Sequence, residues 1–355
     1  MPEHLLMMKH ALECSTQART LSPPAPWIGC VIADEEKIIA QACSEHSKGE
    51  HAEVLALSQV RDRNLEAATM YLTLEPCCHR GRTPPCIDAI IESGIRHVVI
   101  ATQDPDENLR GRGIAQLREK GLDVEVGVLE NEIKHELRSY FHHRRHKRSY
   151  TVLTITETLD GCLPTHSKDQ WISSKESIDK HLMRNESQAI VVDARTILKS
   201  NPLLTVRHSP LQGKAPLRVI IDRDDIVPIN AQVFQTKTAP TLCITSGNVN
   251  RNKLLLKQGV ETLSWNKPGH ISCRFIQQEL AKRDVLQMLV EGEGITMDSF
   301  IREQAFHELI IYVRPQLAGK AGHHLSTSLP NLHLPALHLK KTLTLEDTVC
   351  LHYVK

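Results

Sequence analysis

The 355-residue sequence has few aromatic residues, almost no net charge and no long apolar run. Aromatic residues make up 4% of the chain, and the formal net charge is +1. A near-neutral chain is a poor match to proteins that bind nucleic acid or anionic membranes through bulk charge. No apolar stretch approaches the roughly 20 residues needed to span a bilayer. We therefore expect no nucleic-acid partner and no membrane partner.

The sequence also lacks the features of a secreted protein. Residues 1–12 contain an early acid and a broken apolar run, unlike the basic start and continuous apolar centre of a signal peptide. The ten cysteines are dispersed, which does not resemble the disulfide framework of small secreted domains. We expect a cytoplasmic protein with reduced cysteines. With 41% hydrophobic and 24% charged residues, the composition allows two globular domains.

Helical and strand patterns alternate through both halves of the chain, which predicts an α/β fold with sheets covered on both faces. In the first half we expect strands over 27–33, 37–42, 68–74, 96–102 and 122–128, and helices over 5–14, 51–60, 87–93, 114–120 and 130–141. In the second half we expect strands over 151–158, 189–193, 217–222, 241–245, 287–291, 309–313 and 349–354, helices over 175–186, 274–283 and 297–304, and a loop over 319–338.

A basic run over 142–148 separates the two halves. No aromatic residues are interleaved with it, as they are in surfaces that stack nucleic-acid bases. We therefore interpret this run as a helix end and linker rather than as a nucleic-acid patch.

One pattern in the first half contains residues that can bind a metal ion and transfer protons. His51 and Glu53 begin a predicted helix, Cys77 directly follows a predicted strand, and Cys86 lies on the loop beyond it. One histidine and two cysteines are suitable Zn²⁺ ligands, and three protein ligands leave a fourth tetrahedral position for water. Glu53 remains free to transfer protons. Zinc-dependent nucleobase deaminases have the same combination, so the pattern predicts hydrolytic deamination of an amino-substituted heterocycle.

The alternative is that His51 and Glu53 cap a helix while Cys77 and Cys86 are small buried residues. Cys78 is expected to pack rather than bind metal, because adjacent residues of one turn do not both reach the same ion. The eight residues between the two ligand cysteines form a longer loop than the common spacing of two. This loop contains His79, Arg80 and Arg82, and paired arginines suit a phosphate group.

The segment Glu75-Pro-Cys-Cys-His-Arg-Gly-Arg-Thr-Pro-Pro-Cys86, together with His51-Ala-Glu53 and Gln103-Asp-Pro105, closely resembles the bifunctional pyrimidine deaminase/reductase family of riboflavin biosynthesis. The order and the length agree over nearly the whole chain. The resemblance implies a cytidine-deaminase-like domain over residues 1–145, which deaminates a phosphoribosylated diaminopyrimidinone. By position it implies His51, Cys77 and Cys86 as zinc ligands, Glu53 as the catalytic acid/base, and substrate contacts from the loops that carry His79, Arg82, Asp104 and Asn108.

The second half resembles the reductase domain of the same family through the segments 158–161, 170–173, 201–207 and 307–312. The resemblance implies a dihydrofolate-reductase-like domain over residues 150–355 that uses NADPH to reduce the ribosyl group to ribityl. By position it implies substrate contacts from Arg184, Leu204, Arg207 and Glu291, with the two arginines on the phosphate, and cofactor contacts from Trp171 and Thr196. The implied cofactors are Zn²⁺ and NADPH, the implied partner is a small phosphorylated pyrimidine, and we expect a homo-oligomer.

Several positions depart from the family pattern. Ala25 stands between two prolines where the family usually has an asparagine that hydrogen-bonds the pyrimidine. Five changes fall in the reductase half: Thr154 for a lysine, Glu157 for a small residue, Asp169 for a serine, Ser200-Asn201 for two aspartates and Glu293 for a glycine. Three of them add acids to a site for two phosphorylated anions, which disfavours binding.

These departures leave alternatives open. The leading interpretation is a working deaminase with a reductase that is active, reduced or lost, and neutral drift in a working reductase explains the same changes. A diverged paralogue acting on a related pyrimidine or pterin is the second enzymatic interpretation, motivated by Ala25. A binding protein whose second domain only holds substrate is an alternative of a different class. A nucleic-acid editor fits least, given the fused second domain and the near-zero charge.

Overall fold

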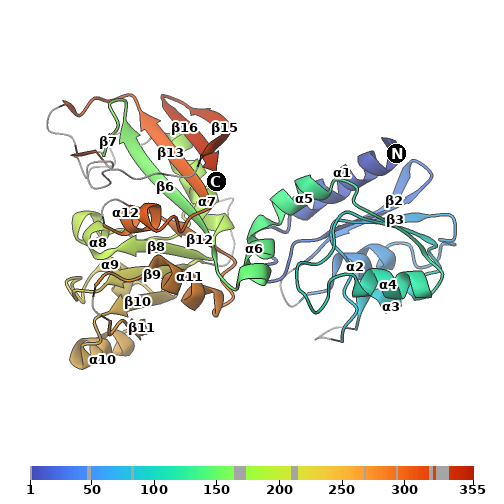
Figure 1. Ribbon diagram of the computed structural model, residues 1–355, viewed down its shortest axis with the longest axis horizontal. Helices are drawn as coiled ribbons and strands as arrows, with labels where there is room; N and C mark the ends of the chain where they lie inside the picture. Colours follow the sequence, from blue (N-terminus) through green and yellow to red (C-terminus); the bar gives the residue numbers. More distant parts are fainter. Residues whose placement is uncertain are drawn as a thin grey trace. The chain divides into compact units, whose positions relative to one another are not determined.

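The computed structural model describes residues 2–45, 49–80, 84–163, 173–208, 215–267, 269–292, 295–319, 323–324 and 336–355. The chain folds into two compact units, Met1–Lys147 and Arg148–Lys355, which are described in turn (Figure 1). Within the described residues, no helix combines the length and the apolarity that crossing a membrane requires.

The first unit is built on a five-stranded sheet with the order β2-β1-β3-β4-β5. Its strands are β1 (Gly29–Asp34), β2 (Lys37–Cys43), β3 (Thr69–Leu72), β4 (His97–Ile100) and β5 (Asp123–Val126). β1 is antiparallel to β2 and β3, whereas β3, β4 and β5 are parallel. Parallel neighbours need crossover connections, which the helices after β3 and β4 provide.

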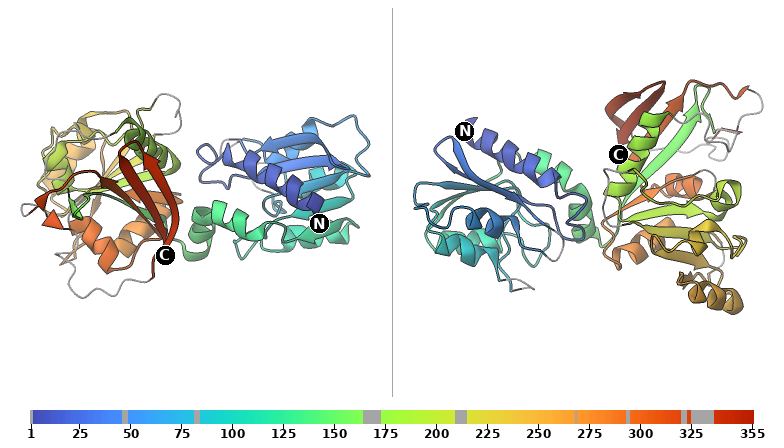
Figure 2. Two further views of the ribbon diagram at one scale, coloured as in Figure 1. Left: turned by 90° about the horizontal axis from the view of Figure 1, so that it is seen from above. Right: turned by 180° about the vertical axis from the view of Figure 1, so that it is seen from behind.

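Helices cover both faces of this sheet (Figures 1 and 2). The helix α1 (Pro2–Thr16) lies on one face, and α2 (Ala52–Ser58), α3 (Cys86–Glu92) and α4 (Arg112–Glu119) lie on the other. Gly29 lets α1 approach β1 closely, because a Cβ atom there would lie 1.9 Å from the carbonyl oxygen of Ala11. On the opposite face α2 packs against α3, which brings the N-terminal ends of these two helices together.

The second unit contains a nine-stranded sheet with the order β11-β10-β9-β8-β12-β6-β13-β16-β15. Its strands are β6 (Tyr150–Thr158), β8 (Ala189–Asp193), β9 (Leu217–Asp222), β10 (Thr241–Thr245), β11 (Glu261–Ser264), β12 (Gln287–Val290), β13 (Glu308–Arg314), β15 (His338–Leu345) and β16 (Thr348–Val354). Neighbours from β11 to β13 in that order are parallel, and the last two pairs are antiparallel. A separate small ladder joins β7 (Cys162–Leu163) to β14 (His323–His324).

Six helices of the described chain accompany this sheet: α7 (Ser174–Glu186), α8 (Ala194–Ser200), α9 (Gln232–Gln235), α10 (Val249–Lys257), α11 (Cys273–Ala281) and α12 (Ile295–Arg302). Alternate residues of β8 enter different cores. Val191 packs with side chains of α11 and α12, whereas Val192 packs with side chains of α8, α9 and α10. All five residues of β8 are buried, as expected for a parallel strand covered on both faces.

The α/β class predicted from the sequence is confirmed, and most predicted strands and helices match within a few residues. The helix predicted over 130–141 is wrong: α5 (Glu130–Glu136) and α6 (Arg138–His146) are separate helices that meet at Leu137, and the basic run lies largely within α6. The sequence patterns did not predict β7, α8, α9, α10, β11, β14 or β15, and β14 lies within the range predicted as a loop. The strand β15 is mostly exposed and polar, so it lacks the apolar run on which strand prediction depends.

Candidate active sites

The first site lies where the N-terminal ends of α2 and α3 meet. His51 is the N-cap residue of α2, Cys86 is the first residue of α3, and Cys77 lies in the loop after β3. One potential ligand atom from each of these side chains lies within 4.8 Å of the other two. His51 Nδ1 is 3.0 Å from Cys86 Sγ and 3.7 Å from Cys77 Sγ. Three residues from separate parts of the sequence therefore converge at one point.

These separations suit a tetrahedral zinc ion. Usual Zn–N and Zn–S bond lengths place two neighbouring ligand atoms about 3.5 Å apart. Among the described residues, this cluster holds three side chains that could bind metal, so a fourth position is left for water, as in catalytic rather than structural zinc sites. Cys78 is next to Cys77 in the chain but does not belong to the cluster.

Glu53 lies beside this cluster in the first turn of α2. Its side chain is fully buried, and among the described residues neither carboxylate oxygen has a hydrogen-bond partner. Burial raises the pKa of this carboxyl above its usual value. A buried carboxyl without partners destabilises a fold unless a bound group satisfies it. The helix-capping alternative lacks support, because His51 makes no side-chain capping bond.

The two thiols differ in acidity. The pKa of Cys77 is lowered, first because its sulfur accepts a hydrogen bond from Cys86, and also because it pairs with His51. The pKa of Cys86 is raised by the same interaction with Cys77 and by burial. Because metal ligands must be deprotonated, the cluster already favours a thiolate at Cys77 before an ion is bound.

Glu75 organises the loop that borders the site, a role that the sequence analysis missed. Its buried carboxylate accepts hydrogen bonds from the backbone N–H groups of Asp104, Gly111, Gly113 and Ile114, at 2.9 to 3.3 Å. Gly113 is required at this contact, since a Cβ atom would lie 2.4 Å from the carbonyl oxygen of Pro76. The sequence contained one signal for this role. Glu75 follows an apolar strand and directly precedes the Pro-Cys pair, and a buried acid needs hydrogen-bond donors nearby.

The other residues predicted to contact the deaminase substrate differ in their surroundings. Asp104 is buried and accepts hydrogen bonds from Tyr140 Oη at 3.2 Å and from the N–H group of Asp106 at 2.8 Å. Asn108 donates its side-chain amide to Asp106 at 3.2 Å. His79 is exposed on the loop after Cys77. Arg82 lies outside the described residues.

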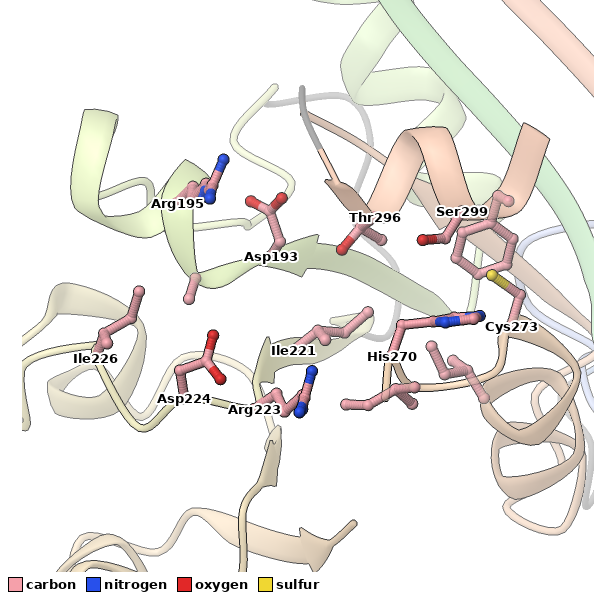
Figure 3. A pocket seen from close by; sticks show the side chains of 14 residues that line it. Asp193, Arg195, Ile221, Arg223, Asp224, Ile226, His270, Cys273, Thr296 and Ser299 are labelled. Carbon is pink, nitrogen blue, oxygen red and sulfur yellow. The ribbon is translucent and has the colours of Figure 1, made fainter. Parts of the chain in front are cut away.

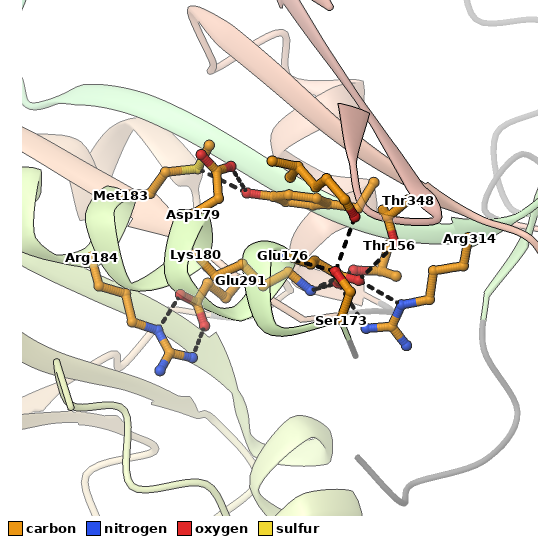
Figure 4. A network of polar contacts seen from close by, with 12 residues as sticks. Thr156, Ser173, Glu176, Asp179, Lys180, Met183, Arg184, Glu291, Arg314 and Thr348 are labelled. Carbon is orange, nitrogen blue, oxygen red and sulfur yellow. Dashed lines mark hydrogen bonds and ion pairs between the residues drawn. The ribbon is translucent and has the colours of Figure 1, made fainter. Parts of the chain in front are cut away.

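The second site lies where α7 faces the carboxyl end of β12. Arg184 and Glu291 form an ion pair with two hydrogen bonds, each 2.7 Å long, which Figure 4 shows beside a second cluster on α7. In that cluster the fully buried Glu176 accepts hydrogen bonds from Arg314 and from Lys180. These contacts fix α7 to the sheet and therefore fix the position of Arg184.

The segment after α8 carries two more of the predicted residues. Leu204 is buried and has a left-handed backbone with φ of 52°. Arg207 is exposed, and its backbone N–H group donates to Nδ1 of His181 at 3.3 Å. Burial, together with the nearby Arg184 and Arg207, lowers the pKa of His181 to about 4. A neutral His181 therefore adds no positive charge beside Arg184 of α7 and Arg207.

The predicted cofactor residue Thr196 lies at the N-terminus of α8, beside the end of β12. Its backbone N–H and its hydroxyl both bond to Asp193 Oδ1, at 2.8 Å each. The backbone of Gly292 (φ 105°) passes so close that a Cβ atom there would lie 2.5 Å from the Thr196 hydroxyl. Asp193 Oδ2 is buried and has no partner within the described ranges, so the residues around Thr196 offer an acceptor to a bound group, as a cofactor site requires.

Trp171, Asp169 and Glu293 lie outside the described residues. Three of the five departures in the reductase half are described. Ser200 is the last residue of α8, and Asn201 Oδ1 accepts a hydrogen bond from the backbone N–H group of Gln232 at 2.9 Å. Thr154 is buried and donates its hydroxyl to the carbonyl oxygen of Val290 at 3.3 Å. Glu157 is partly buried near the carboxyl end of β6, and burial raises the pKa of its carboxyl.

Comparison with known proteins identifies the family of each unit. Residues 1–102 match the cytidine and deoxycytidylate deaminase zinc-binding region, and residues 149–351 match the RibD C-terminal domain. The chain is 38% identical to the riboflavin biosynthesis protein RibD of Aquifex aeolicus over 88% of this chain and 87% of the relative. It is 31% identical to RibD of Escherichia coli over 98% of both chains. The structure of a diaminohydroxyphosphoribosylaminopyrimidine deaminase/5-amino-6-(5-phosphoribosylamino)uracil reductase from Thermotoga maritima is similar, with 30% identity, a TM-score of 0.87, and coverage of 99% of this chain and 98% of that one.

The zinc cluster in one unit and the reductase fold in the other thus occur together in one chain, which belongs to the RibD family of bifunctional riboflavin biosynthesis enzymes.

Proposed function

We propose that the first unit hydrolyses the amino group of a phosphoribosylated diaminopyrimidinone, and that the second unit reduces the ribosyl group of the product to ribityl with NADPH. The observation that carries the proposal is Glu53, a fully buried carboxyl beside a three-residue metal cluster, whose two oxygens have no hydrogen-bond partner in the part of the chain that the structure describes. We assign the deaminase to residues 1–145 and the reductase to residues 150–355.

In the deaminase, His51, Cys77 and Cys86 hold the zinc ion, which when bound makes water acidic enough to act as a nucleophile near neutral pH. Glu53 accepts a proton from the attacking water and delivers it to a ring nitrogen. The same carboxylate then takes the proton of the hydroxyl group that has been added to the ring carbon and passes it to the departing amino group, so that the C–N bond breaks, ammonia leaves and a carbonyl remains. Asp104, Asn108, His79 and Arg82 bind the rest of the substrate.

In the reductase, NADPH when bound supplies the hydride. Arg184 and Arg207 bind the substrate phosphate, and Leu204 and Glu291 line the substrate beside them. Trp171 and Thr196 contact the cofactor. Arg207 makes no ion pair within the described part of the chain, so its guanidinium is available to an anion.

The experiment separates the two reactions by following ammonia release and NADPH consumption on protein of measured zinc content. Glu53→Gln is expected to abolish ammonia release while keeping the zinc. Glu66→Gln changes an exposed acid of the same unit and is the matched control. Persistent ammonia release from Glu53→Gln would contradict the acid/base assignment.

A second candidate is a working deaminase joined to a diverged, non-catalytic reductase. The partly buried Glu157 motivates it, because an acid near the carboxyl end of β6 repels a phosphorylated cofactor. This candidate predicts ammonia release without NADPH consumption, even when the deaminated product is supplied. Ala25 motivates the paralogue alternative, which predicts slow turnover of the family substrate and faster turnover of a related pyrimidine or pterin.

Location and assembly are also part of the proposal. All ten cysteines are free thiols, which supports a cytoplasmic location. A homo-oligomer remains a prediction, and light scattering of the purified chain tests it.

A further inference from the structure

The basic run over 142–148 has no part in either proposed reaction. The cavity of about 190 Å³ shown in Figure 3, by contrast, is lined by Asp193, which bonds to Thr196, and it therefore belongs to the proposed cofactor site. Most of the basic run lies in α6, the last helix of the first unit. Two side chains of this helix, Tyr140 and Arg144, contact segments that are far away in the sequence, and these contacts indicate a role for the helix.

Tyr140 connects α6 to the loop that carries Asp104. Its side chain is 4% exposed, and its hydroxyl donates a hydrogen bond to Asp104 Oδ2 at 3.2 Å. The other carboxylate oxygen of Asp104 accepts a hydrogen bond from the backbone N–H group of Asp106 at 2.8 Å. Burial raises the pKa of Tyr140, so the hydroxyl keeps its proton and acts as the donor. The orientation of the Asp104 carboxylate is therefore fixed by α6 on one side and by its own loop on the other.

Arg144, one helical turn after Tyr140, connects α6 to the segment that carries Ala25. Its Nη2 donates a long hydrogen bond, 3.5 Å, to the carbonyl oxygen of Pro24. Its guanidinium also lies over the Tyr140 ring, with the central carbon 5.1 Å from the ring centroid, a distance at which a cation and a ring attract each other. Because the guanidinium and the ring support each other, they hold the two substrate segments through one connected pair of side chains.

The preceding helix contributes a third contact, again to the segment around Ala25. Glu136, the last residue of α5, accepts hydrogen bonds from Trp27 Nε1 at 2.9 Å and from Arg19 Nε at 2.7 Å. The segment is therefore held on both sides of Ala25. The three contacts come from residues spaced four apart, which places them in one stripe along α5 and α6: Glu136, Tyr140 and Arg144.

We infer that Tyr140 and Arg144 are positioning residues of the deaminase, which hold the Asp104 loop and the segment around Ala25 in the arrangement that the substrate requires. Neither residue needs to contact the substrate itself. The role matters in this chain because Ala25 can offer the substrate only backbone groups, and the position of that backbone is set by these contacts. The inference rests on the proposed deaminase function, since it assumes that both segments face the substrate.

Steady-state ammonia release by the full chain, measured over a range of concentrations of the phosphoribosylated diaminopyrimidinone, tests the inference. Tyr140→Phe removes only the hydroxyl, and Arg144→Met removes the donors while it keeps the length of the side chain. Each variant is expected to raise KM about fivefold, the equivalent of one lost hydrogen bond, and to change kcat less than about twofold. Arg144→Lys keeps a cation and a donor, so it should keep KM within about twofold of the wild-type value.

Two matched variants separate positioning from a loss of stability. Tyr71→Phe removes the hydroxyl of another buried tyrosine of the first unit, which hydrogen-bonds His4 at 2.9 Å. Arg145→Met changes the neighbouring arginine of α6, whose guanidinium lies over the Phe141 ring. Neither variant should change KM. Zinc content and thermal unfolding temperature show that each variant is folded.

If either Tyr140→Phe or Arg144→Met leaves KM unchanged, or lowers only kcat, the inference is wrong while the proposed deaminase stands. An equal rise of KM in Tyr71→Phe would mean that lost stability is the cause, and it would also overturn the inference. If the wild-type chain releases no ammonia from this substrate, the proposed function fails, and the inference with it.

Discussion

Arg184 and Glu291, 107 residues apart in the sequence, hold each other through two parallel hydrogen bonds, from Nε to Oε1 and from Nη2 to Oε2 (Figure 4). The two side chains are 15% and 16% exposed. The planar guanidinium matches the carboxylate in a way that a lysine ammonium does not. The pair fixes the end of β12 to α7, at the point where the substrate of the reductase is expected.

Arg184→Met is expected to remove reductase activity and to lower the free energy of unfolding of the second unit by about 3 kcal/mol, because Glu291 is left as a largely buried charge without a partner. The double variant Arg184→Met/Glu291→Leu should recover most of this stability but not the activity. Chemical denaturation and NADPH consumption measure the two effects. Recovery of activity in the double variant would show that the pair is structural only.

Cys86→Ser is expected to lower the zinc content and to abolish ammonia release, whereas Cys78→Ser should change neither. The reason is position: Cys86 Sγ belongs to the three-residue cluster and Cys78 does not, although both are near Cys77. Metal analysis after dialysis, with ammonia release assayed in parallel, provides the measurement. Equal zinc loss in both variants would mean that the ligand set is assigned incorrectly.

Removal of zinc with a chelator should stop ammonia release and leave NADPH consumption with pre-deaminated substrate unchanged. Each unit has its own sheet and its own buried apolar side chains, and the metal cluster belongs to the first unit. Added Zn²⁺ should restore ammonia release. A simultaneous loss of both activities would contradict the assignment of the two reactions to separate units.

The zinc cluster was predictable from the sequence because its spacing is imposed locally. His51 starts one helix, Cys86 starts another, and Cys77 follows a buried strand, so short motifs carry the information. The pairing of Arg184 with Glu291 was not predictable in this way. It depends on where α7 crosses the end of β12, which follows from the packing of the whole sheet.

Glu75 is intermediate between the zinc cluster and the Arg184–Glu291 pair. Its place beside the Pro-Cys pair belongs to a short motif, but its hydrogen-bond partners come from a loop about 30 residues later. The edge strand β15 was missed for a different reason. Its side chains are largely exposed and polar, and it is a strand because its backbone pairs with β16 rather than because it buries an apolar face.

Glu75→Gln is expected to lower the stability of the first unit by about 2 kcal/mol, since four backbone N–H groups lose a charged acceptor. The loop that carries Asp104 should loosen, so the KM of the deaminase should rise more than its kcat falls. Glu92→Gln, an exposed acid of α3, is the matched control. An unchanged KM in a less stable Glu75→Gln protein would limit Glu75 to a structural role.

His307 predicts a pH dependence of stability in the second unit. Its ring stacks on Tyr150, with centroids 4.3 Å apart, and its Nδ1 accepts a hydrogen bond from the backbone N–H group of Thr151 at 3.0 Å. Burial is the main reason that the pKa of this imidazole falls from 6.5 to about 4. In the folded state the neutral ring is therefore favoured.

Because the unfolded chain binds a proton at His307 at a higher pH than the folded chain does, stability is lost as the pH falls from about 6.5 to about 4. The shift corresponds to about 3 kcal/mol across that window.

His307→Gln keeps a hydrogen-bond acceptor for the N–H group of Thr151 but cannot be protonated, so the unfolding free energy of this variant should depend less steeply on pH. Denaturation at pH 7, 6, 5 and 4 provides the comparison, with His270→Gln, an exposed histidine, as control. Parallel pH curves for the wild-type protein and His307→Gln would show that other groups cause the acid sensitivity.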